Sequence, residues 1–251
     1  MAGEVTLTIS QGIGTIEFFH PKGNSLPSQL LNELCNAIDT AGSNSEVSVV
    51  VLRSKGSGAF CAGASFDELL AIENDEKARV FFSGFGRVIS SMKNCPKFIV
   101  CRVQGKAVGG GVGLIAASDY AIASEAASVK LSELSIGFGP FVIAPAVIRK
   151  IGVSAFSTLT VDSKKWKSSS WALEKGLFNS VEHDEAALDN SLNELATSLS
   201  SYSKEAMMHI KTTFWEGFED LETELDQRAR LSGKLSQSDA TQHILSAIKK
   251  S

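Results

Sequence analysis

The sequence predicts an α/β fold, because strand-like apolar segments alternate with amphipathic helical segments along much of the chain. Residues 47–52 form a run of β-branched and other apolar residues that only Ser48 interrupts, which is typical of a strand covered on both faces. A second buried strand is expected at 98–103. From about Asp184 onward the periodicity is helical only. The length of 251 residues suits one large domain, or a domain with an appendage.

The first elements follow from alternation and from turn residues. Apolar residues alternate with polar ones over 5–9, and a turn at Gln11–Gly12 leads into a second strand at 13–19, which predicts a hairpin. A helix is expected to begin at Pro27–Ser28, because proline suits the first turn of a helix. Gly42 is expected to end it.

The remaining elements are predicted from apolar periodicity in the same way. We expect helices over 68–72 and 76–94, a strand over 121–123, and C-terminal helices over 185–199, 203–217, 219–234 and 239–249. The chain is therefore divided into a core at 1–195 and a helical region at 196–251, which packs on the core or on another subunit.

Composition excludes several classes of function. The chain has 24 basic and 28 acidic residues and a net charge of −4, which argues against nucleic acid as a partner. No run approaches the length of about 18 apolar residues that a membrane-spanning helix needs. The first ten residues lack the basic and apolar regions of a signal peptide, so a cytoplasmic location is expected.

Cysteine and histidine spacing gives no support for a metal site or a disulfide framework. The four cysteines, at 35, 61, 95 and 101, contain no C-x-x-C pair, so we expect free, buried thiols. The four histidines form no H-E-x-x-H motif or Cys/His cluster. G-x-S-x-G, Walker and G-x-G-x-x-G motifs are absent as well, which argues against serine hydrolase, nucleotidase and dehydrogenase functions.

Two loops of small residues share one design. The loops at 58–65 and 108–113 each leave a buried strand, pass through glycines and enter a helix. Small residues let a ligand approach the backbone, and a helix start leaves N–H groups without partners. One N–H group from each loop would form an oxyanion hole, which stabilises negative charge on a carbonyl oxygen. Each loop taken alone is also explained as a tight turn.

The order and spacing of several motifs resemble those of the crotonase family, the enoyl-CoA hydratases and isomerases, over nearly the whole chain. The matching segments are His20–Leu26, Ala59–Ala64 with Ser65 in place of the family's Asp, Gly105–Gly111, Ser118–Asp119, Gly176–Phe178 and Ser238–Ala240. The resemblance implies a spiral of stacked ββα turns with a C-terminal helical region that forms trimers or hexamers. It also implies an acyl-CoA substrate, with coenzyme A as the carrier and no permanently bound cofactor.

The resemblance also implies roles for individual residues. The oxyanion donors would be the backbone N–H groups of Ala64 and Gly110, and the acid/base would be Glu133. Hydratases of the family usually carry a second glutamate, but the matching position here is Gly113. A single carboxylate favours moving a double bond from the Δ3 to the Δ2 position. A hydratase that uses Glu133 alone is the alternative, and an exposed, solvated Glu133 is the non-functional interpretation.

Further residues are candidates for contacts with the substrate. Ala62, Gly63 and Gly109 lie in the two small-residue loops, while Phe138 and Phe141 either line an acyl pocket or pack in the core. Gly113 either allows close helix packing or leaves space beside the thioester for a bulky acyl group or a water molecule. A binding protein that kept the fold but lost the chemistry is the remaining alternative, and the acidic charge and the retained Glu133 argue against it.

Overall fold

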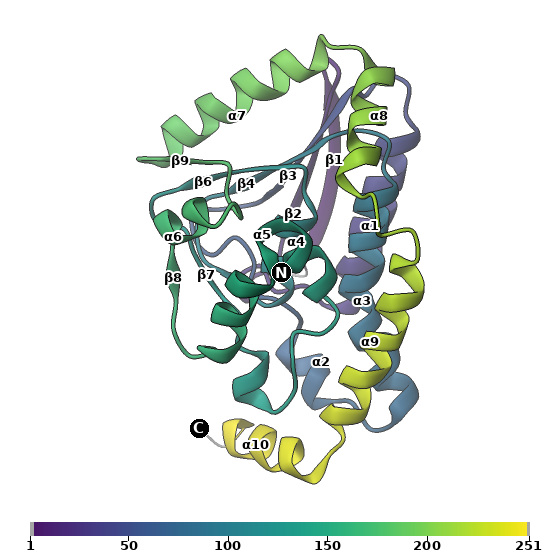
Figure 1. The fold of residues 1–251 in the computed structure, drawn as a ribbon, viewed down its shortest axis with the longest axis vertical. Helices are drawn as coiled ribbons and strands as arrows, with labels where there is room; N and C mark the ends of the chain where they lie inside the picture. The colour runs from purple at the N-terminus through teal and green to yellow at the C-terminus, as the bar shows by residue number, and fades with distance from the viewer. Residues whose placement is uncertain (1–2, 250–251) are drawn as a thin grey trace.

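A six-stranded sheet forms the main layer of the computed structural model, which describes residues 3–249 (Figure 1). Its order is β1 (Glu4–Ser10), β2 (Ile13–Phe19), β3 (Val49–Ser54), β4 (Ile99–Val103), β6 (Tyr120–Ser124) and β9 (Ser180–Glu182). The β1–β2 pair is antiparallel and all later neighbours are parallel. The turn residues Gln11 and Gly12 have φ values of 51° and 80°, as a two-residue type I′ hairpin requires. The predicted hairpin is confirmed.

A second, smaller sheet lies beside the first and was not predicted. It contains β5 (Ala107–Val108), β7 (Ser128–Lys130) and β8 (Lys167–Ser168). Strand β5 pairs with β7 in parallel, and β7 pairs with β8 antiparallel. This sheet matters for function because β5 leads directly into the second glycine loop, and β7 leads to the segment that carries Glu133.

Helices cover both faces of the main sheet (Figure 1). They are α1 (Ser28–Ser43), α2 (Phe66–Leu70), α3 (Asp75–Asn94), α4 (Gly110–Ala117), a 3₁₀ turn η1 (Glu133–Ile136), α5 (Ala144–Val161), α6 (Ser169–Glu174), α7 (Glu185–Ser200), α8 (Lys204–Phe214), α9 (Leu221–Ser236) and α10 (Asp239–Lys249). The α/β class is confirmed.

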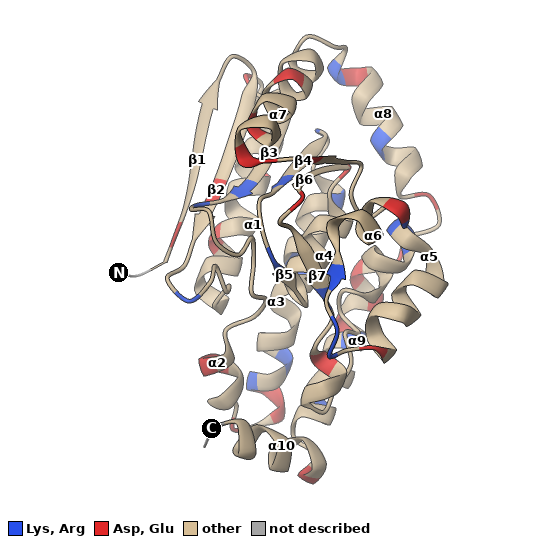
Figure 2. Cartoon of the chain, turned by 90° about the vertical axis from the view of Figure 1, so that its left-hand side faces the viewer, with Lys and Arg blue, Asp and Glu red and all other residues tan. Residues whose placement is uncertain are grey.

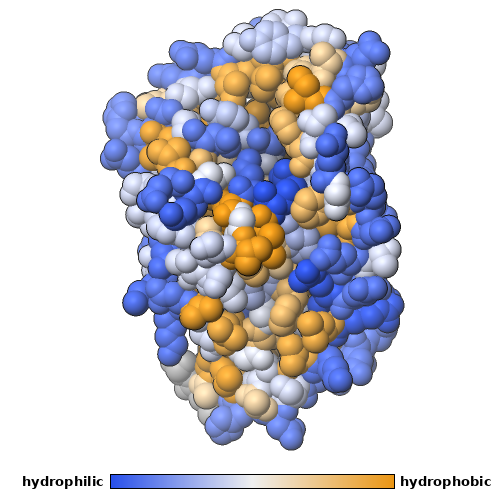
Figure 3. All heavy atoms as spheres, in the orientation of Figure 1, coloured by the Kyte–Doolittle hydropathy of each residue, from blue (hydrophilic) through white to orange (hydrophobic). Residues whose placement is uncertain are grey.

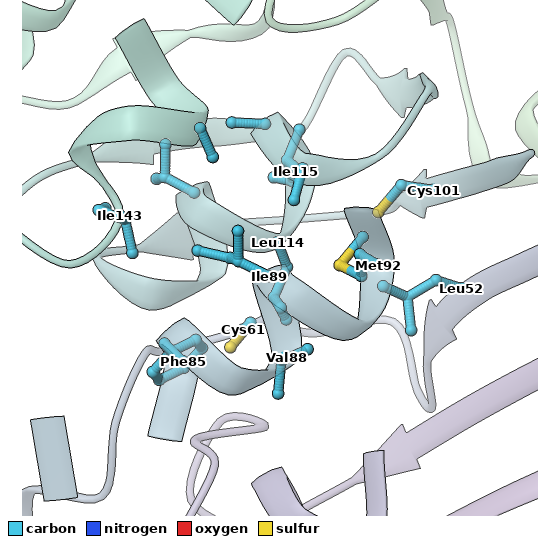
Figure 4. Packing of buried hydrophobic residues seen from close by; sticks show 14 of the residues in the cluster. Leu52, Cys61, Phe85, Val88, Ile89, Met92, Cys101, Leu114, Ile115 and Ile143 are labelled. Atoms are coloured by element: carbon cyan, nitrogen blue, oxygen red, sulfur yellow. The ribbon is translucent and has the colours of Figure 1, made fainter. Parts of the chain in front are cut away.

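The parallel strands are buried on both faces, as the apolar run at 47–52 predicted. Val50 and Leu52 of β3 face the larger cluster, which includes residues of α1, α3 and α4. Val49 and Val51 face the other side, where they pack with Leu188 and other residues of α7. Figure 4 shows side chains of α3 and α4 lying against each other within the larger cluster.

The C-terminal helices share this core. Helix α9 packs along α3, and Trp215, Leu221 and Leu225 belong to the larger cluster. The Arg149 guanidinium lies 3.9 Å from the centre of the Trp215 ring, a cation–π contact within the chain. Helix α7 runs from Glu185 to Ser200, so the division expected at residue 195 falls inside a helix.

Charged residues are spread along the helices, with others on strands and connecting loops (Figure 2). Residues 3–249 contain no helix that is both long and apolar enough to cross a membrane. Apolar atoms also appear on the surface, on the face that α5 and α8 present in Figure 3. They include Val153, Val161, Ile210 and Phe214, which are between 41% and 73% exposed.

Candidate active site

Backbone hydrogen bonds join the two small-residue loops. The Cys61 N–H donates to the Lys106 carbonyl at 3.2 Å, and the Val108 N–H donates to the Cys61 carbonyl at 2.9 Å. Gly63 follows with a φ of 88°, a conformation that favours glycine. A Cβ atom at Gly63 would lie 3.0 Å from the Val108 carbonyl oxygen and 3.8 Å from the Gly110 nitrogen. Only glycine therefore lets the first loop approach the second so closely.

The N–H groups of Ala64 and Gly110 are free to bind a ligand. Within residues 3–249, neither of them donates a hydrogen bond to a protein group. Gly110 is the first residue of α4, so its N–H lies at the positive end of that helix. Ala64 precedes α2 by two residues and lines the same cavity as Gly110. The two donors expected from the sequence are thus brought together.

Glu133 begins η1 and reaches back over the second loop. A Cβ atom at Gly109 would lie 2.7 Å from the Glu133 Oε1 atom, so the carboxylate rests on the glycine that precedes the Gly110 donor. Its Oε2 atom is buried and has no hydrogen-bond partner among the described residues. Burial raises the pKa of Glu133 from 4.5 to about 7, against smaller lowering effects of the backbone N–H groups of residues 133 and 132. The solvated interpretation of Glu133 is wrong.

A cavity of about 180 Å³ opens beside these groups. Its lining includes Ala62, Gly63, Gly109, Phe138 and Phe141, the predicted substrate contacts other than Gly113. Phe138 packs edge-to-face with Phe82, their ring centres 5.1 Å apart. The small-residue loops therefore form one wall of the cavity, and aromatic rings form much of the rest.

Gly113 is not among the residues that line the cavity. A Cβ atom there would lie 2.5 Å from the Cγ2 atom of Ile143 and 3.6 Å from the Cδ1 atom of Ile89. Ile143 itself lines the cavity, and Figure 4 shows it near Leu114 of α4. Of the two interpretations of Gly113, close packing holds, and the space-leaving role was wrong. The reason is that Ile143 fills the space beside α4.

Several lining residues were not assigned to the site from sequence. Phe85 of α3 covers Gly110, because the end of its ring occupies the place where a Cβ atom at Gly110 would lie. The others include Ile136, Val142 and Ile143, which follow Glu133 along the chain. The helical spacing of Phe81, Phe82 and Phe85 was a usable signal for a shared face. It does not distinguish a cavity wall from a closed core.

Two other acidic residues near the first loop have structural contacts. The Glu68 carboxylate accepts hydrogen bonds from the Ser28 N–H at 2.9 Å and from the Ser28 hydroxyl at 2.8 Å, at the start of α1. Asp67 forms an exposed ion pair with Lys22. Residues 3–249 contain no group of three or more His, Cys, Asp or Glu side chains that could hold a metal ion, and all four cysteines are free thiols.

The chain is similar in sequence to known enzymes. A sequence model of the enoyl-CoA hydratase/isomerase family matches residues 8–249. The chain belongs to this family. It is 26% identical over 207 residues to a probable enoyl-CoA hydratase of Bacillus subtilis, which covers 82% of this chain and 80% of the relative. It is 31% identical over 178 residues to the enoyl-CoA hydratase AKT6-1 of Alternaria alternata, covering 69% of this chain and 58% of that one.

Solved structures share the fold. The enoyl-CoA hydratase of Bacillus halodurans superposes with a TM-score of 0.88, at 22% identity, over 97% of this chain and 99% of that one. The crotonase-type core with a C-terminal helical region is therefore confirmed. Membership of the family identifies this chain as an enzyme of the enoyl-CoA hydratase/isomerase type, a family that acts on CoA thioesters.

Proposed function

We propose that the protein isomerises 3-enoyl-CoA thioesters to 2-enoyl-CoA thioesters, with Glu133 as the acid/base. The observation that carries this proposal is the isolated carboxylate. Among residues 3–249, Glu133 is the only ionisable side chain that lines the cavity, and it rests on Gly109, beside Gly110. A pKa of about 7 suits a group that must both take up and release a proton near neutral pH.

The reaction needs one base and one oxyanion hole. The Glu133 carboxylate removes a proton from C2, and the electron pair moves onto the thioester oxygen. The N–H groups of Ala64 and Gly110 stabilise this negative charge, and each such donor contributes about 3–4 kcal/mol in other enzymes. The protonated Glu133 then returns the proton to C4, which places the double bond between C2 and C3. No atom is gained or lost.

The packing of Ile143 beside Gly113 favours isomerisation over hydration. Addition of water to C3 needs a water molecule that is held and activated beside the double bond. The position where related hydratases carry a second glutamate is Gly113, and Ile143 packs against it. An apolar side chain at that place does not hold a water molecule.

Hydration of 2-enoyl-CoA is the second candidate. It is favoured by the names of the relatives, since the matches in Bacillus subtilis and Alternaria alternata are both called enoyl-CoA hydratases. In that case Glu133 alone would activate the water. Coenzyme A serves as the substrate's carrier in either reaction. A homotrimer or hexamer and a cytoplasmic location stay predictions.

A paired assay tests the proposal. Purified protein is supplied with a trans-3-enoyl-CoA and, separately, with a trans-2-enoyl-CoA, and both reactions are followed. We expect isomerisation with little hydration, and a loss of roughly 100-fold or more in kcat for Glu133→Gln. Glu194→Gln, an exposed substitution on α7, is the matched control and should keep full activity. Dominant hydration that disappears in Glu133→Gln would instead establish the second candidate.

A further inference from the structure

We propose that the acyl group of the substrate is uncharged and apolar, and that the cavity rejects acyl groups that end in a carboxylate. This inference deepens the proposed function, because it takes the placement of the thioester at Ala64 and Gly110 from that proposal. The preference for an uncharged acyl group is argued only from the residues that line the cavity.

The cavity shares residues with a buried apolar cluster beside Ala64. Ala64 packs against the cluster formed by Leu69, Phe81, Phe138 and Leu245. These four side chains come from α2, α3, the segment after η1 and α10, and each is at most 9% exposed. Leu69, Phe81 and Phe138 also line the cavity, so an acyl chain that enters it from Ala64 meets side chains that offer only carbon atoms.

Aromatic rings make up much of the wall. Six of the lining residues are phenylalanines, at positions 66, 81, 82, 85, 138 and 141. Phe82 packs edge-to-face with both Phe81 and Phe138, with ring centres 5.1 Å apart in each pair. Burial of a carbon chain against such rings is favourable, at about 25 cal/mol per Å² of apolar surface.

The wall offers no positive charge to an acidic acyl group. Its polar side chains, apart from Glu133, are the serines at 65, 132 and 232. Ser65 accepts from the Glu68 N–H and Ser232 donates to the Arg228 carbonyl, so both are engaged within the protein. A carboxylate buried here would lack a counter-ion and would face Glu133, which carries a negative charge when it acts as a base.

Neighbouring lysines are held outside the cavity. Lys106 and Lys130 lie over the ring of Trp166, with the Nζ atoms 5.1 Å and 4.6 Å from the ring centre. Lys22 pairs with Asp67 on the surface. None of the three lines the cavity.

Binding of unreactive thioesters tests the inference without any turnover. Hexanoyl-CoA and the monothioester adipoyl-CoA have six acyl carbons each and differ only in a terminal methyl or carboxylate. We expect calorimetry near neutral pH to give a Kd at least about 100-fold weaker for adipoyl-CoA, because its carboxylate would be buried without a counter-ion. Dissociation constants within about threefold of each other would overturn the inference.

A positive charge placed in the wall should weaken the preference for an uncharged acyl group. Ile136 lines the cavity and is half-buried, so Ile136→Lys puts an amine beside the acyl group. We expect this variant to narrow the difference between the two dissociation constants by about tenfold or more. Leu134→Lys adds the same charge at a residue that is 51% exposed and outside the lining, and should leave the difference unchanged. An equal effect of both substitutions would contradict the inference.

The binding assay and the activity assay separate two kinds of failure. If hexanoyl-CoA binds and adipoyl-CoA does not, but neither 3-enoyl nor 2-enoyl thioesters react, the acyl preference holds and the proposed reaction is wrong. If 3-hexenoyl-CoA and 3-hexenedioyl-CoA are both isomerised with similar kcat/KM, the reaction holds and the acyl preference is wrong.

Discussion

Asp119 and Glu133 are both buried carboxylates, but their surroundings differ. The Asp119 Oδ2 atom accepts from the Ile99 N–H at 2.7 Å and pairs with the Lys211 Nζ atom at 3.0 Å, and both ionic side chains are at most 4% exposed. Glu133 has no basic partner among the described residues. A paired buried charge holds elements together, whereas an unpaired one keeps its proton near neutral pH. That difference distinguishes a structural carboxylate from a candidate base.

The pH dependence of activity follows from the raised pKa of Glu133. The base must be ionised in the free enzyme, so kcat/KM for isomerisation should rise with pH through a midpoint of about 7. Initial rates measured across the range from about pH 5 to 9 would show this acidic limb. A midpoint near the ordinary glutamate value of 4.5 would contradict the burial of the group.

The raised pKa of Glu133 also makes the stability of the folded protein depend on pH. Between the unfolded-state value of 4.5 and the folded-state value of about 7, the folded protein holds a proton that the unfolded chain has released. The stability contributed by Glu133 is therefore lost as pH rises through this window. Glu133→Gln removes this effect, so it should raise the free energy of unfolding at about pH 8 by roughly 3 kcal/mol and change it little at about pH 4.5.

Urea unfolding at both pH values measures this difference. Glu194→Gln, on the exposed face of α7, is the control and should show no such pH-dependent gain. An equal change at both pH values would mean that the substitution acts through packing and not through ionisation.

Residues of the candidate site could be predicted from sequence only where local geometry demands them. Gly63 and Gly109 were identified as members of the two small-residue loops, and the structure explains them by positive φ values and by the close approach of neighbouring groups. Glu133 was assigned only through the family resemblance, since its burial depends on contacts made by the whole fold. Ile143 was missed as the residue that fills the space beside Gly113, because 30 positions separate the two in the sequence.

At the scale of elements, α10 supports the turn that carries Glu133. The Thr241 hydroxyl donates to the Gly137 carbonyl at 2.7 Å, directly after η1. Gly137 has a φ of 99°, and a Cβ atom there would lie 2.5 Å from the Thr241 Oγ1 atom. Thr241 is fully buried. The last helix therefore fixes the end of η1 opposite to Glu133.

Thr241→Val should loosen this support without touching the substrate. The variant keeps the shape of the side chain but leaves the Gly137 carbonyl without its partner, at a cost of about 1–3 kcal/mol in stability. We expect kcat to fall about fivefold or more with little change in KM, because Glu133 is less well positioned. The midpoint of the pH profile should also move downward as Glu133 gains contact with water.

A control substitution at a second threonine distinguishes an effect on the position of Glu133 from a general loss of stability. Thr212→Val on α8 removes an exposed hydroxyl that donates to the Met208 carbonyl at 3.1 Å, far from the cavity lining. It should leave kcat and the pH profile unchanged. A Thr241→Val variant that loses stability but keeps both kinetic features would show that the contact is structural only.

Elements were predicted well where periodicity extends over several turns and poorly where it does not. The helices at 76–94 and 239–249 match α3 and α10 closely. The elements between 125 and 183 were missed because β7, β8 and β9 contain only two or three residues each. Helix α5 is interrupted at Gly152, where φ is 74°, which breaks its pattern. Strands β7, β8 and β9 form by pairing with segments that are distant in the sequence, and local sequence does not encode this pairing.

At the scale of the whole molecule, the C-terminal helices belong to the core as well as to the surface. The four helices were expected, and packing on the core was one of the two alternatives given for them; the structure places α9 along α3. Local periodicity shows that a helix has an apolar face and does not show which surface covers it. Trp215 lies within the chain's own core, while residues of α5 and α8 keep apolar surface exposed.

The exposed apolar residues lead to a prediction about assembly. Because Val153 and Val161 of α5 are 67% and 73% exposed, we expect this face to be covered by another copy of the chain. Light scattering should give a mass near three or six times the 26.7 kDa of one chain. Val153→Asp combined with Val161→Asp should lower that mass. A wild-type mass equal to one chain would contradict the prediction.

Backbone groups and side chains contribute differently to the cavity, and this affects how its acyl specificity can change during evolution. The proposed donors at Ala64 and Gly110 are fixed by backbone geometry, whereas Leu69 and Phe138 contribute cavity-lining side chains from segments outside the two loops. Point mutations in these segments can alter which acyl groups are accepted while the thioester chemistry is inherited unchanged. Phe85 is constrained on both sides, because its ring lines the cavity and also covers Gly110. In a lineage that explores new substrates, we expect Phe85 to change more slowly than its neighbours.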